Sequence, residues 1–179
     1  TTPVLRPDGS VKTEAGYDDA TGLYYAPAGL AHGSLAMPEQ PTQDDARAAV
    51  ETLLAVVCDF PFAGPIDKAV WLAGLLALVG RPAYEGNAPM FDVDAAAAGT
   101  GKTLLCDTMA IIATGRRLPR SPYVADDNEM RKRILAHVLA GDGAALIDNV
   151  PNGARVGWPS LDAALTSGAI RDRILGLSE

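Results

Sequence analysis

The sequence predicts an α/β protein with a mainly parallel sheet flanked by helices, preceded by a helical segment and a small β-rich N-terminal piece. Hydrophobic residues make up 48% of the 179 residues, which is enough for a packed core. Two apolar patterns with helical spacing lie within residues 42–82. From residue 83 onward, short apolar runs alternate with helical patterns, as is typical of parallel strands joined by helices.

The first 36 residues predict a β-rich segment. Residues 7–9 read Pro-Asp-Gly, a turn sequence, and short apolar runs on both sides of it predict a hairpin. A second turn at residues 18–22 is surrounded by tyrosines and a leucine. Residues 33–41 contain two prolines and several small or polar residues, which favours a linker.

Thr42 is expected to cap a helix, because its hydroxyl can accept the amide of Asp45. Apolar residues at helical spacing then continue to Val57, and residues 60–65 break the helix. A second helix over residues 66–79 is apolar nearly all round, which predicts burial between other elements.

Residues 83–179 are predicted to hold the alternating strands and helices. Strands are expected at residues 90–94, 123–125, 144–147 and 174–175. Helices are expected at residues 102–113, 129–139 and 159–166. The chain therefore divides into a β-rich segment (1–36), a helical segment (42–82) and an α/β core (83–179).

Composition excludes several classes of protein. The net charge of −7 is opposite to that of most domains that bind nucleic acid alone, so DNA contacts are expected to be local or supplied by an assembly. Cys58 and Cys106 lack metal-ligand spacing, and we expect buried, reduced thiols. The two isolated histidines do not predict a zinc site.

Targeting signals do not stand out in the sequence. The apolar run over residues 69–79 is too short to span a bilayer, and no basic-then-apolar leader is evident, so we expect a cytoplasmic protein with no membrane partner. The chain begins with Thr1 rather than Met, which indicates a piece of a longer protein.

The strongest motif occupies residues 96–103, Ala-Ala-Ala-Gly-Thr-Gly-Lys-Thr, hereafter the 96–103 loop. It fits the phosphate-binding pattern Ala/Gly-x-x-x-x-Gly-Lys-Ser/Thr, in which small residues let backbone amides wrap a phosphate. Lys102 would reach the β- and γ-phosphates, Thr103 would hold Mg²⁺, and the following helix would direct its positive end at the same phosphates. The predicted nucleotide contacts are Ala98, Gly99, Thr100, Gly101, Lys102, Thr103 and Leu104.

A simpler interpretation is a Gly-Thr-Gly turn before a capped helix. The apolar run before the loop and the helical pattern after it favour the phosphate-binding interpretation.

Asp148 follows a second apolar run, where a carboxylate can hold Mg²⁺. The alternative is an Asp that caps a strand-to-loop turn. Asn149 comes next, at a position where many ATPases with this phosphate-binding pattern have Glu. An amide cannot act as a base, although it can orient water or a γ-phosphate. We therefore expect Glu129, or Asp126 or Asp127, to supply the water-activating carboxylate, although Glu129 could simply start a helix.

Basic residues gather at three places in the sequence. We expect them to lie on solvated faces or to act as helix-end charges. The alternative is that some of them line a subunit interface or a DNA channel. They are Arg116, Arg117, Arg120, Arg131, Lys132, Arg133, Arg171 and Arg173.

Together these residues resemble the ATPases of the AAA+ and superfamily 3 helicases, especially those of phage and mobile-element primase–helicase proteins. The resemblance implies a P-loop core, ATP and Mg²⁺ as cofactors, and a homo-oligomeric ring, usually a hexamer, that moves along single-stranded DNA. It rests on residues 94–107, 126–134, 146–149 and 165–179, and on residues 6–25, which look like the segment preceding such modules.

The family continues with a sensor strand, an arginine finger and a lid, and the sequence ends at Glu179 before any of these. The resemblance therefore implies that this chain alone binds nucleotide weakly and hydrolyses it poorly. Two alternatives remain open: a small-molecule or nucleotide kinase, and a nucleotide-gated DNA-binding or loader module without unwinding activity.

Overall fold

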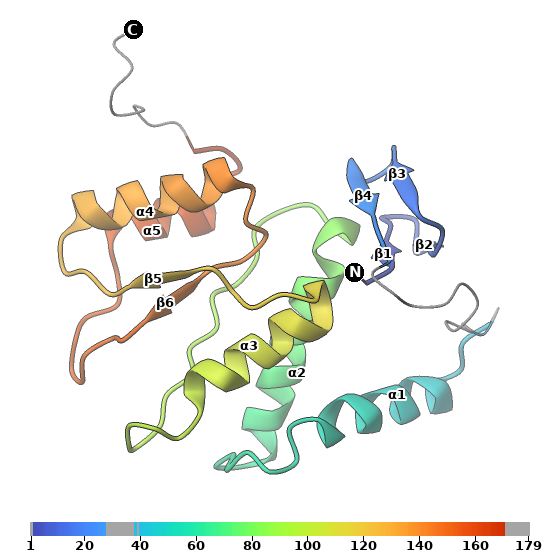
Figure 1. Ribbon diagram of the computed structural model, residues 1–179, viewed down its shortest axis with the longest axis horizontal. Helices are drawn as coiled ribbons and strands as arrows, with labels where there is room; N and C mark the ends of the chain where they lie inside the picture. Colours follow the sequence, from blue (N-terminus) through green and yellow to red (C-terminus); the bar gives the residue numbers. More distant parts are fainter. Residues whose placement is uncertain (1, 28–37, 39, 171–179) are drawn as a thin grey trace, which may run out of the picture. The chain divides into compact units, whose positions relative to one another are not determined.

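The computed structural model describes residues 2–27, 38 and 40–170, which fall into two compact units (Figure 1). The first unit comprises Thr1–Tyr84 and Val93–Arg117, and the second comprises Glu85–Asp92 and Leu118–Glu179. Helices and short strands occur in both units, which is compatible with the predicted α/β class. Within the described residues, however, parallel pairing is limited to a single pair of strands.

The N-terminal segment forms two antiparallel hairpins, so the predicted hairpin is confirmed. The strands are β1 (Val4–Leu5), β2 (Val11–Lys12), β3 (Gly16–Asp18) and β4 (Leu23–Tyr25). Gly9 closes the first turn with a φ of 83°, and its amide donates to the carbonyl of Arg6 at 3.0 Å. Glycine adopts this left-handed conformation without steric cost.

An ion pair joins the two hairpins. Arg6, in the first turn, donates from Nε to Oδ1 of Asp18 at 2.9 Å, and the Thr21 hydroxyl donates to the other carboxylate oxygen at 2.8 Å. Asp18 is only 3% exposed. The hydrogen bond from Arg6 lowers the pKa of Asp18 below its ordinary value, because it stabilises the charged carboxylate.

This ion pair predicts acid sensitivity. Because folding lowers the pKa of Asp18, its contribution to stability is present above the ordinary pKa of Asp, about 3.9, and is lost as the pH falls through the lowered value. We expect Asp18→Asn to be less stable than wild type at pH 7 and to lose less stability between pH 5 and pH 2. Urea denaturation across this range measures both effects. Asp19→Asn, at the exposed neighbour, is the matched control for the loss of one carboxylate, and a pH profile of Asp18→Asn identical to that of wild type would contradict the prediction.

The predicted cap at Thr42 is confirmed. Helix α1 (Gln43–Ala55) begins with a capping box, in which the Asp45 amide donates to the Thr42 hydroxyl at 3.2 Å and the Thr42 amide donates to the Asp45 carboxylate at 2.8 Å. This reciprocal pair satisfies two amides that the helix leaves without acceptors.

Cys58 departs from the expectation of a buried thiol, whereas Cys106 meets it. Helix α1 ends at Ala55, and Cys58 lies in the turn beyond it, where its amide donates to the carbonyl of Ala55 at 3.3 Å. The side chain is exposed because the helical apolar pattern stops before it is reached.

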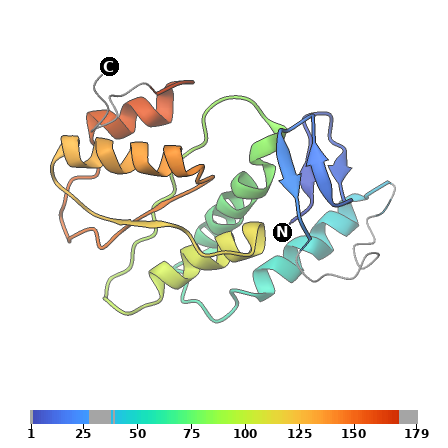
Figure 2. The ribbon, with the colours of Figure 1, turned by 45° about the horizontal axis from the view of Figure 1, so that its top comes forward.

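The core of the first unit lies between α2 (Pro65–Gly80) and α3 (Lys102–Thr114), which lie side by side in Figures 1 and 2. A short 3-10 helix, η1 (Arg81–Ala83), follows α2. The indole Nε1 of Trp71 donates to the carbonyl of Leu105 at 3.2 Å, which links the two helices directly. The buried side chains of this core include Trp71, Leu75, Leu105, Cys106, Met109, Ala110 and Ala113.

Helix α2 is not buried all round, which corrects the expectation from its composition. Ile66 is 75% exposed and Leu76 is 54% exposed. Among the described residues, its buried positions are Trp71, Gly74 and Leu75. One face of the helix therefore forms the core, although apolar residues occur on every face.

The second unit contains the parallel strand pair. Strands β5 (Arg120–Pro122) and β6 (Leu146–Asp148) pair in parallel, with Ser121 opposite Ile147. Helix α4 (Asp127–Ala140) connects them, and α5 (Pro159–Thr166) packs against α4. This β–α–β arrangement is the element of parallel structure that the alternating pattern predicts.

Strand positions differ from the prediction in three places. The strand expected at 123–125 lies at Arg120–Pro122, and the one expected at 144–147 lies at Leu146–Asp148, because ladder pairing and not the apolar run decides the register. Residues 90–94 form no strand, and Met90 is 49% exposed. The strand predicted at 174–175 and most of the predicted linker at 33–41 lie outside the described residues.

A polar chain connects β5 with the end of α4. The Ser121 hydroxyl lies 2.8 Å from Nε2 of His137, and Nδ1 of His137 lies 2.7 Å from the Asp142 carboxylate. These contacts fix the C-terminal turn of α4 against the strand. Across the part of the chain that is described, the helices are all too short or too polar for a bilayer span.

Candidate functional site

The 96–103 loop has the backbone that its glycines predict. Gly99 has a φ of 77° and Gly101 a φ of 87°, both in the left-handed region that favours glycine. Residues 96–99 are exposed, and residues 100–103 are half-buried. Small side chains and left-handed backbone together leave the main chain of the loop accessible to a ligand.

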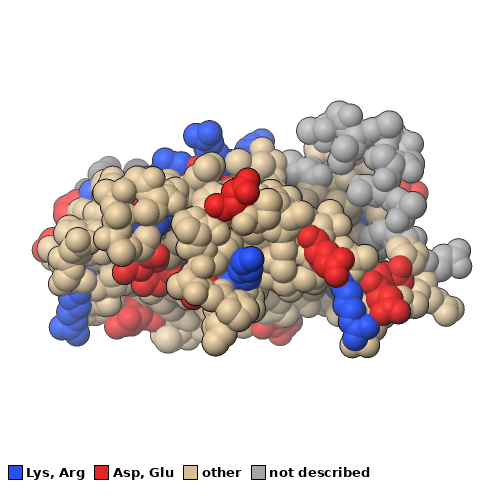
Figure 3. All heavy atoms as spheres, turned by 90° about the horizontal axis from the view of Figure 1, so that it is seen from below, with Lys and Arg blue, Asp and Glu red and all other residues tan. Residues whose placement is uncertain are grey.

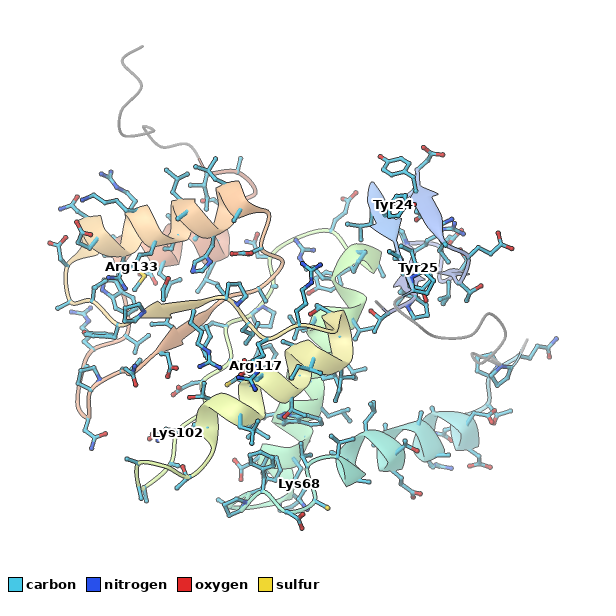
Figure 4. The ribbon with its side chains drawn as sticks, viewed as in Figure 1. Tyr24, Tyr25, Lys68, Lys102, Arg117 and Arg133 are labelled. Carbon is cyan, nitrogen blue, oxygen red and sulfur yellow. The ribbon has the colours of Figure 1, made fainter. Side chains whose placement is uncertain are left out.

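Lys102 folds back over this loop. Its Nζ atom donates to the carbonyl of Ala97 at 3.4 Å, and the Thr100 hydroxyl donates to the same carbonyl at 3.2 Å. Figure 4 labels Lys102 beside the loop that precedes α3. An ammonium group is therefore held at the bend, where an anion would need a positive charge.

The start of α3 adds donors and a partial positive charge. Gly101 is the N-cap residue, and as a glycine it has no side chain that could occupy the first amides of the helix. The first amides of a helix have no acceptors within it, and the helix dipole favours anions here. Thr103 is half-buried in the first turn, and Leu104 is 54% exposed. The loop and helix start are thus suited to hold a phosphate group.

Asp148 ends β6 in the second unit. Its Oδ1 accepts the amide of Asn149 at 2.8 Å, and its carbonyl accepts the amide of Tyr123 at 2.8 Å. Asn149 has a φ of 58°. Because the 96–103 loop belongs to the first unit and Asp148 to the second, a magnesium site that combines Thr103 with Asp148 remains a prediction.

The three carboxylates proposed to activate water have local structural roles. Asp126 caps α4 by accepting the Glu129 amide at 3.0 Å. Asp127 accepts the Ser160 amide at 3.0 Å, which caps α5 and lowers the pKa of Asp127. Glu129 is half-exposed and pairs with Lys132, one turn along α4. Glu129 is therefore the one whose carboxylate is not engaged in a helix cap.

These roles predict different stabilities for two substitutions. Asp126→Ala removes the cap of α4 and should lower the free energy of unfolding by about 1 kcal/mol. Glu129→Gln disturbs only an exposed ion pair and should change it by less than about 0.5 kcal/mol. Urea denaturation followed by circular dichroism measures both changes. Equal losses for the two variants would contradict the assigned roles.

Two of the described basic residues have partners close by within their own unit. Nε of Arg117 lies 3.8 Å from the buried carboxylate of Asp107, and Arg133 donates to the carbonyl of Pro122. Acidic side chains accompany the basic ones on the face shown in Figure 3. Arg171 and Arg173 lie outside the described residues. The contacts of Arg117 and Arg133 support structural roles for these two residues.

Two contacts of the loop region were missed by the sequence interpretation. Phe60 lies against Gly101, although 41 positions separate them in the sequence. Asp107, in the second turn of α3, is 2% exposed and pairs with Arg117. The sequence signal for this pair is an acidic residue within an apolar helical pattern. Neither contact follows from a local motif.

The donors for a metal ion are sparse. Among the described residues, no group of three or more His, Cys, Asp or Glu side chains is arranged to hold a metal by itself. A magnesium ion that arrives with a nucleotide needs fewer protein ligands, because phosphates and water supply the others. Thr103 and Asp148 fit that smaller requirement by residue type.

Comparison with known proteins gives no significant match to any protein-family model, curated protein or solved structure. The interpretation of function therefore depends on the residues of the site.

Proposed function

We propose that the chain is the ATP-binding and hydrolysing motor module of a DNA replication helicase or primase–helicase from a phage or mobile element, with a P-loop core of the AAA+ and superfamily 3 type. One observation supports nucleotide binding above all others. Two left-handed glycines, the folded Lys102 ammonium and the start of α3, whose N-cap residue is Gly101, lie together at the bend of the 96–103 loop. These are the donors that a triphosphate requires.

Each part of the loop has a separate task in this proposal. The backbone amides and the start of α3 hold the β-phosphate, and Lys102 neutralises charge on the β- and γ-phosphates. The Thr103 hydroxyl and the Asp148 carboxylate would hold the magnesium ion, Asn149 would orient water or the γ-phosphate, and Glu129 would accept the proton of the attacking water. Mg²⁺ bound there would supply a Lewis acid that offsets charge on the phosphates.

The acidic character of the chain supports DNA binding by an assembly and not by a broad surface of one chain. A net charge of −7 opposes contact with a phosphate backbone over a broad surface. The proposal therefore assigns single-stranded DNA to a channel that a homo-oligomeric ring of the longer protein forms. The resemblance described above, and not the fold of this chain alone, supports the ring.

Nucleotide binding can be tested on the chain itself. MgATP at about 100 times its dissociation constant should raise the free energy of unfolding by about 2.7 kcal/mol. Lys102→Ala should remove most of this gain, because the charge on the triphosphate loses its partner. Lys68→Ala is the matched control and should keep it. Thermal unfolding with and without MgATP gives the result, and a gain of equal size in Lys102→Ala would contradict the proposal.

The motor function can be tested on the longer protein that the proposal implies. We expect single-stranded DNA to stimulate ATP hydrolysis several-fold, and Glu129→Gln to lower turnover at least tenfold without lowering nucleotide affinity. Phosphate release measured with and without DNA separates the motor function from the two alternative functions. Transfer of phosphate to a small acceptor without stimulation by DNA would indicate a kinase, and nucleotide-dependent DNA binding without unwinding would indicate a loader. Unchanged turnover in Glu129→Gln would exclude that residue as the base.

A further inference from the structure

An aromatic side chain from the connection between α1 and α2 lies against Gly101 of the 96–103 loop. A Cβ atom placed on Gly101 would lie 3.2 Å from Cε1 and 3.9 Å from Cδ1 of the Phe60 ring. At Gly99, the other left-handed glycine of the loop, the same atom would meet nothing within 4 Å. Of the two left-handed glycines of the loop, the ring of Phe60 therefore lies close to Gly101, directly before Lys102, and not to Gly99.

The backbone around Phe60 is held by its own hydrogen bonds. The amide of Phe60 donates to the carbonyl of Val57 at 3.2 Å, and the amide of Phe62 donates to the carbonyl of Phe60 at 2.8 Å. Val57 is 1% exposed, which anchors this turn in the core of the unit. The ring is thus fixed at its base and half-buried.

Packing of the two following helices brings this turn to the loop. Trp71, in the second turn of α2, donates to the carbonyl of Leu105, in the first turn of α3. The early turns of the two helices therefore lie together, and Figure 4 shows Lys68 and Lys102 toward the same end of the helix pair. The ring of Phe62 is engaged differently, because Nζ of Lys68 lies 5.9 Å from its centroid.

We infer that Phe60 is a positioning residue that holds the 96–103 loop in its phosphate-binding shape, an inference that rests on the proposed function for the identity of the ligand. A phenyl ring packs against the Cα of Gly101 without taking any hydrogen bond from the loop. The amides remain available to phosphate oxygens, while the ring restrains the loop at Gly101. Preorganised donors of this kind bind more tightly, because less ordering is needed when the ligand arrives.

The test compares Phe60→Ala and Phe60→Leu with Phe62→Ala as the matched control. Calorimetry measures the affinity for MgATP and for magnesium tripolyphosphate, and hydrogen exchange measures the loop amides without ligand. Phe60→Ala should weaken both ligands by a similar factor, roughly tenfold to a hundredfold, and should speed exchange of residues 98–103. Phe60→Leu should restore part of both properties, and Phe62→Ala should leave them unchanged.

Several outcomes would overturn the inference. Wild-type affinity and exchange in Phe60→Ala, with affinity still lost in Lys102→Ala, would show that the ring does not hold the loop. A loss confined to MgATP would make Phe60 a contact of the nucleoside and not of the loop. If the wild-type chain bound neither ligand, the proposed function would fail, while exchange in the free protein would still decide whether Phe60 restrains the loop. If Phe60→Ala did not fold, Phe60→Leu would decide by the same measurements.

Discussion

The contact between α2 and α3 is the interaction on which the candidate site depends. Each large side chain buried there, such as Leu75 or Met109, contributes about 1.5–3 kcal/mol, and the hydrogen bond from Trp71 to Leu105 fixes the axial position of one helix on the other. The loop that precedes α3 has little regular structure of its own. Its shape is set by where α3 begins and by what surrounds that point.

Local features of the sequence predicted the local structure well. The capping box at Thr42 and the left-handed glycines of the 96–103 loop are determined by residues a few positions apart, so their chemistry can be read from the chain directly. Helix α3 begins at Lys102, the first residue of the expected helix, for the same reason. The backbone conformation of the candidate phosphate-binding loop was therefore accessible to sequence analysis.

Long-range features were not accessible in the same way. The apolar run before Asp148 identified a strand, but the parallel ladder with β5 set its limits at Leu146–Asp148. Likewise, the composition of α2 suggested burial on every side, because periodicity cannot tell which face meets a partner. Phe60 was missed because its role comes from a contact 41 positions away. Pairing and packing across the chain decide these properties, and a single sequence does not record them.

The backbone conformation of Asn149 favours some amino acids over others at the position after Asp148. With a φ of 58°, this position suits asparagine, which tolerates the left-handed conformation better than most residues with a side chain. A glutamate there would carry a conformational penalty of roughly 1 kcal/mol before any chemical benefit appeared. If the chain hydrolyses ATP as proposed, this penalty favours a water-activating acid that comes from elsewhere in the chain.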